Sequence, residues 1–164
     1  MPETDPILFE LQRLRADVDE LIRGEFNPQT ISTWTPAWTG TSTAGVFTYT
    51  TQAGFYIRIG PLVFFWANIH ISAISTPPVG NMTITGLPVT SSATAQNFGQ
   101  VFLGYISNFN FTAAALSLTG YIALGTKTIN LFETFDNIIN VSIPAANFTN
   151  AACQVLISGF YPVD

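Results

Sequence analysis

Apolar and polar residues follow two different periods along this chain, and the change falls near residue 26. Before it, five apolar residues recur at spacings of 4, 3, 4 and 3, namely Ile7, Leu11, Leu14, Val18 and Leu21. These are the a and d positions of a heptad repeat, and they place all five residues on one stripe of a helix. Asp5 suits the N-cap, Pro6 the first helical position and Gly24 the end, so the pattern predicts a helix over about residues 5–23.

The apolar stripe predicts a short parallel coiled coil between copies of the chain. With Leu11 at a, Glu10 falls at g and Arg15 at the next e position, and such residues pair between parallel neighbours. The repeat is compatible with two or three strands. Two heptads are marginal for association in water, so we expect the following domain to contribute to assembly. An amphipathic helix that folds back on its own domain is the alternative.

From Ala44 onward, the residue types and their alternation are those of β-strands. Thr, Val, Ile, Phe and Tyr dominate, and Gly, Pro and Asn interrupt them about every ten residues. The candidate strands are residues 46–51, 54–59, 62–72, 81–85, 100–107, 111–118, 121–124, 128–135, 138–143 and 153–161. So many short strands predict a mainly β head over residues 44–164, either a β-sandwich or a jelly roll.

Residues 1–25 and 26–43 are the predicted stalk helix and linker. The linker contains Trp34 and Trp38, which we expect to pack where the stalk meets the head, with sugar stacking as the alternative. The first 25 residues also hold ten of the fifteen charged side chains. The head is therefore nearly uncharged, and its two positive charges are too few to attract nucleic acid.

The candidate strand 62–72 is apolar on both faces. Val63, Phe65, Ala67, Ile69 and Ile71 point one way, and Leu62, Phe64, Trp66, Asn68 and His70 point the other. A strand of a lone sandwich usually shows one face to water, so the second apolar face predicts contact with a neighbouring subunit. Residues 101–126 carry no charge, but their apolar residues come closer to alternation than to a continuous run, so we expect no membrane insertion. The acidic start of the chain also lacks the features of a signal peptide.

One stretch of the head resembles a known family. Residues 34 to about 92, above all TYTTQAGFYIRIGPLVFFWANIHIS followed by GNMTITGLPVTSS, resemble phage tail-fibre and receptor-binding heads, in which a short helix precedes a trimeric β-structured tip. The shared elements are packing and turn elements, such as the Arg58-Ile59-Gly60 turn and Pro88 at a strand end. The resemblance implies a homotrimeric fibre or spike on the virion surface, made in the host cytoplasm. Such a protein attaches to a host-surface receptor and meets other virion proteins through its stalk.

The residues offer little catalytic or metal-binding chemistry. One histidine, His70, and one cysteine, Cys153, are too few for a zinc site within one chain, and we expect neither a metal nor a cofactor. His70 is interpreted as structural and Cys153 as a small buried apolar residue. The sequence also lacks the G-x-S-x-G elbow that often carries a nucleophilic serine.

The head contains a single pair of neighbouring carboxylates, Glu133 and Asp136. Two carboxylates that flank a groove are the signature of a glycosidase. In FETFDN, however, they are three residues apart in a predicted turn. We therefore expect Glu133 to be exposed or paired with Lys127 or Arg58, Asp136 to cap the turn, and the protein not to be an enzyme.

The many Asn, Ser, Thr and aromatic side chains suit a neutral saccharide as the receptor ligand. The first candidates lie in two loops that join strong strand candidates and flank an aromatic residue, namely Asn108, Phe109 and Asn110, and Asp136 and Asn137. Ordinary turns are the alternative for both loops. For the whole protein, the alternatives are a structural capsid-decorating or adaptor protein of the virion and a cellular trimer of the tumour-necrosis-factor type.

Overall fold

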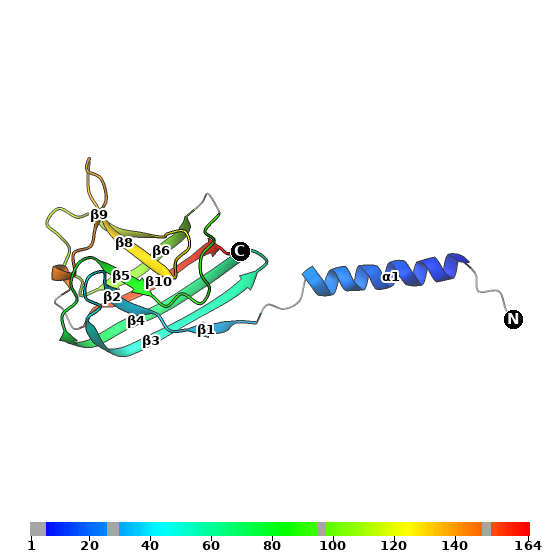
Figure 1. Ribbon diagram of the computed structural model, residues 1–164, viewed down its shortest axis with the longest axis horizontal. Helices are drawn as coiled ribbons and strands as arrows, with labels where there is room; N and C mark the ends of the chain where they lie inside the picture. The colour runs from blue at the N-terminus through cyan, green and yellow to red at the C-terminus, as the bar shows by residue number, and fades with distance from the viewer. Residues whose placement is uncertain (1–5, 26–29, 95–97, 149–151) are drawn as a thin grey trace. The chain divides into compact units, whose positions relative to one another are not determined.

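The computed structural model describes residues 6–25, 30–94, 98–148 and 152–164 (Figure 1). Within the helix, side chains are described at position 7 and over positions 10–19. The chain divides into two compact units, Met1–Thr30 and Ile31–Asp164. The head therefore begins at Ile31, inside the segment predicted as a linker. Asp5 and residues 26–29 lie outside the described residues.

In the first unit, the helix α1 spans Pro6–Glu25. Its position agrees with the heptad pattern. The predicted seam residues Ile7, Leu11, Leu14 and Val18 are between 50% and 69% exposed, and the side chain of Leu21 lies outside the described ones. A single chain thus leaves this stripe open to solvent, and the coiled coil stays a prediction. In the described part of the chain, no helix has both the length and the apolar composition to cross a membrane.

The described residues of the head form strands and one short 3-10 helix. The strands are β1 (Ser32–Trp34), β2 (Ala37–Gly40), β3 (Val46–Ile59), β4 (Leu62–Thr76), β5 (Met82–Thr85), β6 (Gly99–Ser107), β7 (Ser117–Ile122), β8 (Thr128–Thr134), β9 (Val141–Ser142) and β10 (Gln154–Pro162), and the 3-10 helix is η1 (Ala145–Asn147). The prediction of a mainly β head is confirmed.

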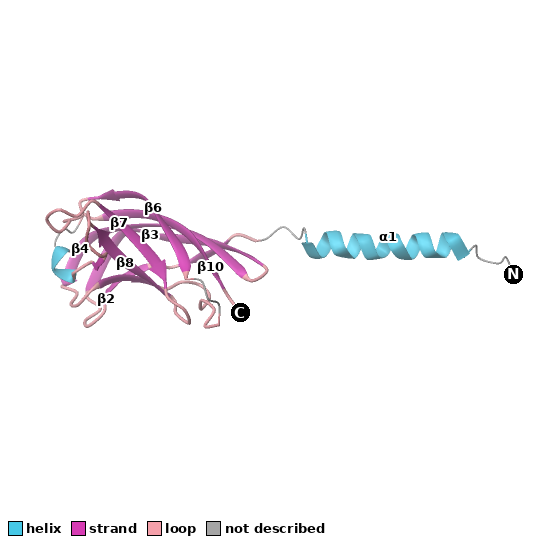
Figure 2. Ribbon diagram, turned by 90° about the horizontal axis from the view of Figure 1, so that it is seen from above, coloured by secondary structure: helices cyan, strands magenta, loops and turns pink. Residues whose placement is uncertain are grey.

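All the strands belong to one antiparallel sheet, in the order β1-β3-β4-β10-β6-β7-β8-β5-β2, with β9 paired to β8. β1 and β2 lie at opposite edges of this sheet, but only two residues separate them in the chain. The sheet must therefore curl until its edges meet, as Figures 1 and 2 show. The sandwich or jelly roll that the strand number suggested is not confirmed, because the pairing runs through a single curled sheet.

Hydrogen bonds fasten the β1–β2 segment to β3. The indole Nε1 of Trp34 donates to the carbonyl of Phe55 at 3.2 Å, and the side-chain amide of Gln52 donates to the carbonyl of Pro36 at 2.9 Å. Trp34 and Trp38 are only 7% and 3% exposed. Both tryptophans belong to the core of the head, so they are not available as a surface for stacking sugars.

The core fills the inside of the curled sheet. The inward residues Val63, Phe65, Ala67, Ile69 and Ile71 of β4 are all buried, as the alternation predicted. They pack with inward residues of β10, β8 and β5 and with the two tryptophans. The opposite side of β4 faces outward and stays partly exposed.

The strand register gives the head two distinct ends. At the proximal end, where the chain enters at Ile31, β1 begins beside the C-terminal end of β3, and the β3–β4 turn lies next to the end of β10. At the distal end, β6 ends beside the start of β10, and β8 ends beside the start of β7. The connections 108–116, 135–140 and 143–148 therefore gather at the distal end, away from the C-terminus (Figure 1). We call these three connections the distal loops.

Candidate functional site

The structure brings both predicted receptor-binding loops to the distal end of the head. Asn108–Asn110 directly follows β6, and Asp136–Asn137 follows β8. The end of β6 lies beside the start of β10, and the end of β8 lies beside the start of β7. Both loops therefore lie at the distal end of the head, although they are distant in sequence. The site is therefore a cluster of loops at one end of the sheet, an arrangement typical of binding surfaces.

Within the first loop, Asn108 and Phe109 have structural roles. Asn108 takes a left-handed conformation with φ +54°, which asparagine tolerates better than most residues, and its side-chain amide donates to the carbonyl of Ala152 at 3.2 Å. Phe109 is half-buried and packs edge-on against Phe111 and Phe148, with ring centroids 5.1 and 5.7 Å away. Phe109 thus anchors the loop, whereas Asn110 is exposed.

The second loop places Asp136 and Asn137 in solvent, and Asn137 is also left-handed, with φ +56°. The next two residues, Ile138 and Ile139, are 63% and 84% exposed. The residue pattern predicts a strand over 138–143, which would bury both side chains, whereas β9 begins only at Val141. An apolar pair after a turn has the same sequence pattern as the start of a buried strand.

The position of Glu133 differs from the prediction. The expectation was a solvent-exposed side chain or an ion pair with Lys127 or Arg58, but Glu133 is fully buried. Lys127 instead donates to the carbonyl of Pro88, and Arg58 to the carbonyls of Gly60 and Asp164. The error arose because residues 108–116 and η1, which cover Glu133, come from other parts of the chain.

The buried carboxylate joins three parts of the distal end. Its Oε1 accepts a hydrogen bond from the backbone N–H of Thr112 at 2.8 Å and one from the side-chain amide of Asn147 at 3.5 Å. The amide of Asn147 also donates to the hydroxyl of Thr112 at 2.8 Å. In addition, the N–H of Leu116 donates to the carbonyl of Thr134 at 2.8 Å. The first distal loop, β8 and η1 therefore hold one another in place.

Glu133 and Asp136 do not face a common groove in this arrangement. Asp136 is exposed at the turn, and Glu133 lies inside the head beneath Thr112 and Asn147. Cys153 is also inaccessible, because it is buried in the core and burial raises the pKa of its thiol to about 12. Across the described residues, no group of three His, Cys, Asp or Glu side chains is placed to hold a metal ion.

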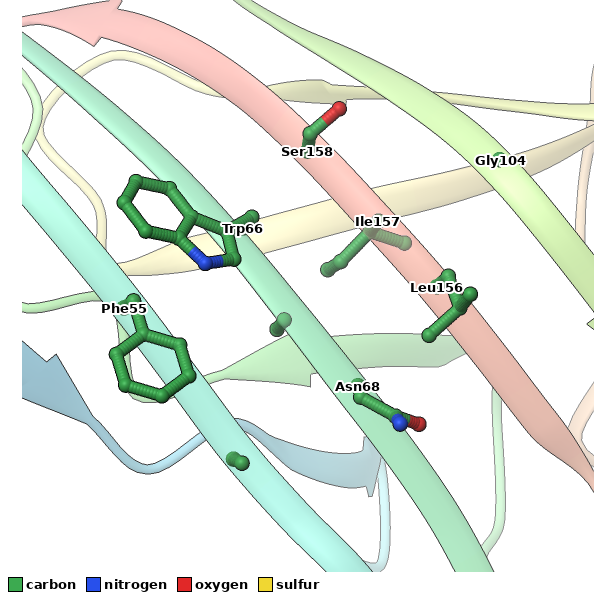
Figure 3. Close-up of a pocket in the computed structure, with 9 residues that line it drawn as sticks. Phe55, Trp66, Asn68, Gly104, Leu156, Ile157 and Ser158 are labelled. Carbon is green, nitrogen blue, oxygen red and sulfur yellow. The ribbon is translucent and has the colours of Figure 1, made fainter.

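A second surface feature lies on the outward side of β3, β4, β10 and β6. We call it the aromatic face and define it by six partly exposed side chains, Phe55, Phe64, Trp66, Phe102, Leu156 and Phe160. A hollow of about 310 Å³ opens in it between Trp66 on β4 and Leu156 and Ser158 on β10, with Phe55 and Asn68 at its border (Figure 3). Asn68 is already engaged, because its Oδ1 accepts a hydrogen bond from the side chain of Gln154 at 3.0 Å.

No protein-family model matches the chain, and no curated protein matches it significantly. The fold, however, is found in a solved structure. It is that of Dettilon tailspike protein (gp208). The TM-score is 0.66, and the match covers 81% of this chain and 23% of the tailspike chain.

The likeness to the tailspike is one of fold. Sequence identity is 15% over the matched region, so the arrangement of strands is shared without most of the side chains. The chain spans less than a quarter of the length of the tailspike. The likeness therefore shows a shared fold and assigns no role to any residue of this head.

Proposed function

We propose that this chain is a virion attachment protein of the tail-fibre or tailspike type, whose distal loops bind a host-surface receptor. The observation that carries the proposal is the gathering of the predicted loops at the end of the head opposite the point where the chain enters it. The fold likeness to a phage tailspike supports a place on the virion surface. A head attached to the virion at its proximal end exposes its distal end to the host surface.

The attachment protein acts as a homotrimer whose stalk helices associate along the seam of Ile7, Leu11, Leu14, Val18 and Leu21. The exposure of the described seam residues supports this step, because a stripe of apolar side chains gains stability when a neighbouring helix covers it. The N-terminal stalk also provides the contact with other virion proteins.

The receptor ligand is a saccharide, bound without catalysis. The exposed residues Asn110, Asp136 and Asn137 offer amide and carboxylate groups that can exchange hydrogen bonds with sugar hydroxyls. Phe111, 44% exposed in the same cluster, offers a ring edge and face for the apolar side of a sugar ring. The burial of Glu133 supports binding without cleavage, since a polymer cannot reach its carboxylate in this conformation.

Adsorption of virions to host cells tests the proposal. The variants are Asn110→Ala and Asn137→Gly, because glycine removes the Asn137 side chain and still accepts the left-handed backbone. We expect each to reduce adsorption by roughly tenfold, the effect of losing about 1.4 kcal/mol of binding free energy. Phe109→Ala should weaken adsorption indirectly, through loss of loop order.

The matched control is Thr90→Ala, an exposed residue in the β5–β6 connection at the proximal end. It should leave adsorption unchanged. If all the distal variants adsorb like the parent virion while the protein keeps its assembly, the distal loops are only connections between strands and the proposed binding surface is wrong.

A structural decorating or adaptor role is the second candidate, and the exposed Ile138 and Ile139 favour it. Two neighbouring apolar side chains at a loop tip are better suited to a protein surface than to sugar hydroxyls. Ile139→Ser separates the two functions. In an adaptor, it would reduce the amount of the protein on purified particles, whereas in an attachment protein that amount would stay the same.

A further inference from the structure

We infer that the aromatic face is the surface through which the heads of neighbouring copies of this chain contact one another. The inference rests on the proposed homotrimer and assigns the contact between its heads. The four strands that carry the face stand side by side in the order β3-β4-β10-β6. Their outward side is thus one continuous surface.

The aromatic rings on this surface touch one another from strand to strand. Phe55 and Trp66 are register partners, and their rings stack at 5.8 Å with an interplanar angle of 23°. Phe64 and Phe160 are also partners, at 5.8 Å, and Phe102 lies 6.4 Å from Phe160. The apolar area is therefore contiguous, which distinguishes it from apolar residues scattered singly over a surface.

The size of the face is appropriate for a subunit contact. Its six side chains are each between 36% and 56% exposed. With aromatic side chains covering roughly 200 Å² each, the exposed part amounts to about 500 Å². A standard interface buries about 800 Å² on each partner, so the face supplies more than half of one. Left uncovered, it would rank with the largest apolar patches that monomeric proteins expose.

The chemistry of the face favours a copy of the same chain as its partner. No Asp, Glu, Lys or Arg lies on the outward side of the paired parts of β4 and β10. The outward side chains there are Leu62, Phe64, Trp66, Asn68, His70, Gln154, Leu156, Ser158, Phe160 and Pro162. Identical uncharged surfaces meet without like-charge repulsion. A saccharide is disfavoured, because its hydroxyls would lose water in a hollow where Asn68 and Ser158 are the two polar side chains in the lining.

The stalk independently favours a second copy of the chain as the partner of the aromatic face. Parallel association through the α1 seam would hold the heads of different copies at the same end of the stalk. It would also raise the effective concentration of each head near the others. The chain enters the head at Ile31, next to Ser32, which is the register partner of Tyr56. Phe55 directly precedes Tyr56 in β3 and is the register partner of Thr33. The aromatic face thus begins close to the point where the stalk is attached.

Sedimentation of the full chain tests the inference. Phe160→Glu places a carboxylate between Phe64 and Phe102, and we expect at least a tenfold rise in the protein concentration needed for half-assembly. The matched control is Phe111→Glu, the same substitution at a similarly exposed phenylalanine in a distal loop. It should shift that concentration less than twofold. Far-ultraviolet circular dichroism confirms that each variant is folded.

Tryptophan fluorescence provides a readout on the unchanged protein. The chain has three tryptophans, of which Trp34 and Trp38 are buried within the head and Trp66 is 39% exposed. Quenching by iodide therefore reports on Trp66. We expect quenching to fall as the protein concentration rises through the assembly range, and to stay high in Phe160→Glu at the same concentrations.

The outcomes separate the inference from the proposed assembly. A wild-type chain that is monomeric at all concentrations overturns both. A wild-type trimer with freely quenched Trp66, or a Phe160→Glu chain that assembles like wild type, overturns the assignment of the aromatic face and leaves the homotrimer standing. A third result would also overturn the assignment of the aromatic face: quenching of Trp66 that falls when host polysaccharide is added but not when the protein concentration rises. The face would then be a saccharide site.

Discussion

At the scale of single residues, Glu133 shows how one side chain can organise a loop cluster. Its Oε1 accepts hydrogen bonds from Thr112 and Asn147, whereas its Oε2 is buried with no partner. We expect Glu133→Ala to lower the free energy of unfolding by about 1–3 kcal/mol, because the Thr112 N–H and the Asn147 amide both lose the carboxylate oxygen that accepts their hydrogen bonds. Glu133→Gln keeps an acceptor oxygen for these two donors, so it should lower the free energy of unfolding by less than Glu133→Ala does.

Urea denaturation measures both effects, with Asp136→Asn as the exposed control that should change the free energy of unfolding by less than about 0.5 kcal/mol. A Glu133→Gln protein as unstable as Glu133→Ala would contradict this account, because the negative charge itself would then be required.

The same residue also marks the limit of sequence-based prediction at this scale. The buried state of Cys153 and the inward side of β4 followed from apolar alternation, and both are confirmed. Glu133 was misjudged because a carboxylate in a polar run is usually exposed. Its burial depends on hydrogen bonds to Thr112 and Asn147, which lie 21 and 14 residues away and leave no local pattern.

At the scale of elements, strands in which residue types alternate over a long range were predicted correctly. Strands that form only because a distant segment pairs with them were not. β4 and β10 follow their predicted ranges closely, since each alternates over many residues. Residues 111–118 have strand-like composition, but β7 begins only at Ser117, and the preceding residues form a loop in which Ala114 is left-handed, with φ +68°. The short strands β1 and β2 fell in the predicted linker, because their pairing partners are distant in sequence.

The stalk helix can be removed to test which element drives assembly. A chain lacking residues 1–25 should keep its β-rich circular dichroism spectrum, because the head is a separate compact unit. It should still associate through the aromatic face, but at protein concentrations at least tenfold higher, since the tether that raises the effective concentration is lost. Sedimentation velocity measures this shift. If the shortened chain is unfolded, or is monomeric at every concentration, the stalk contributes more to folding or assembly than two heptads alone are expected to contribute.

At the scale of the whole molecule, the mainly β class followed from residue types, but the single curled sheet did not. Its closure depends on the two residues between β1 and β2, which belong to opposite sheet edges. Strand order of this kind is decided by contacts between distant segments, and the alternation within each strand is the same for a sandwich and for a curled sheet.

The closure of the sheet also bears on whether the molecule acts as an enzyme. The curl places β7 and β8 so that residues 108–116 cover Glu133, while Asp136 stays on the outside. A glycosidase needs both carboxylates beside the bond to be cleaved, about 5–10 Å apart across one groove. We therefore expect purified protein incubated with host-surface polysaccharide to release no new reducing ends.

Should reducing ends appear, Glu133→Gln and Asp136→Asn decide whether this pair produces them. General acid or base catalysis contributes roughly 10²–10⁴ in rate, so either substitution in a true pair would reduce cleavage by at least a hundredfold. Cleavage that both variants retain would place the catalytic groups elsewhere in the assembled protein, for instance where two heads meet. Cleavage that both variants lose would mean that the loop over Glu133 opens, and the distal loops would then be a lid rather than a fixed binding surface.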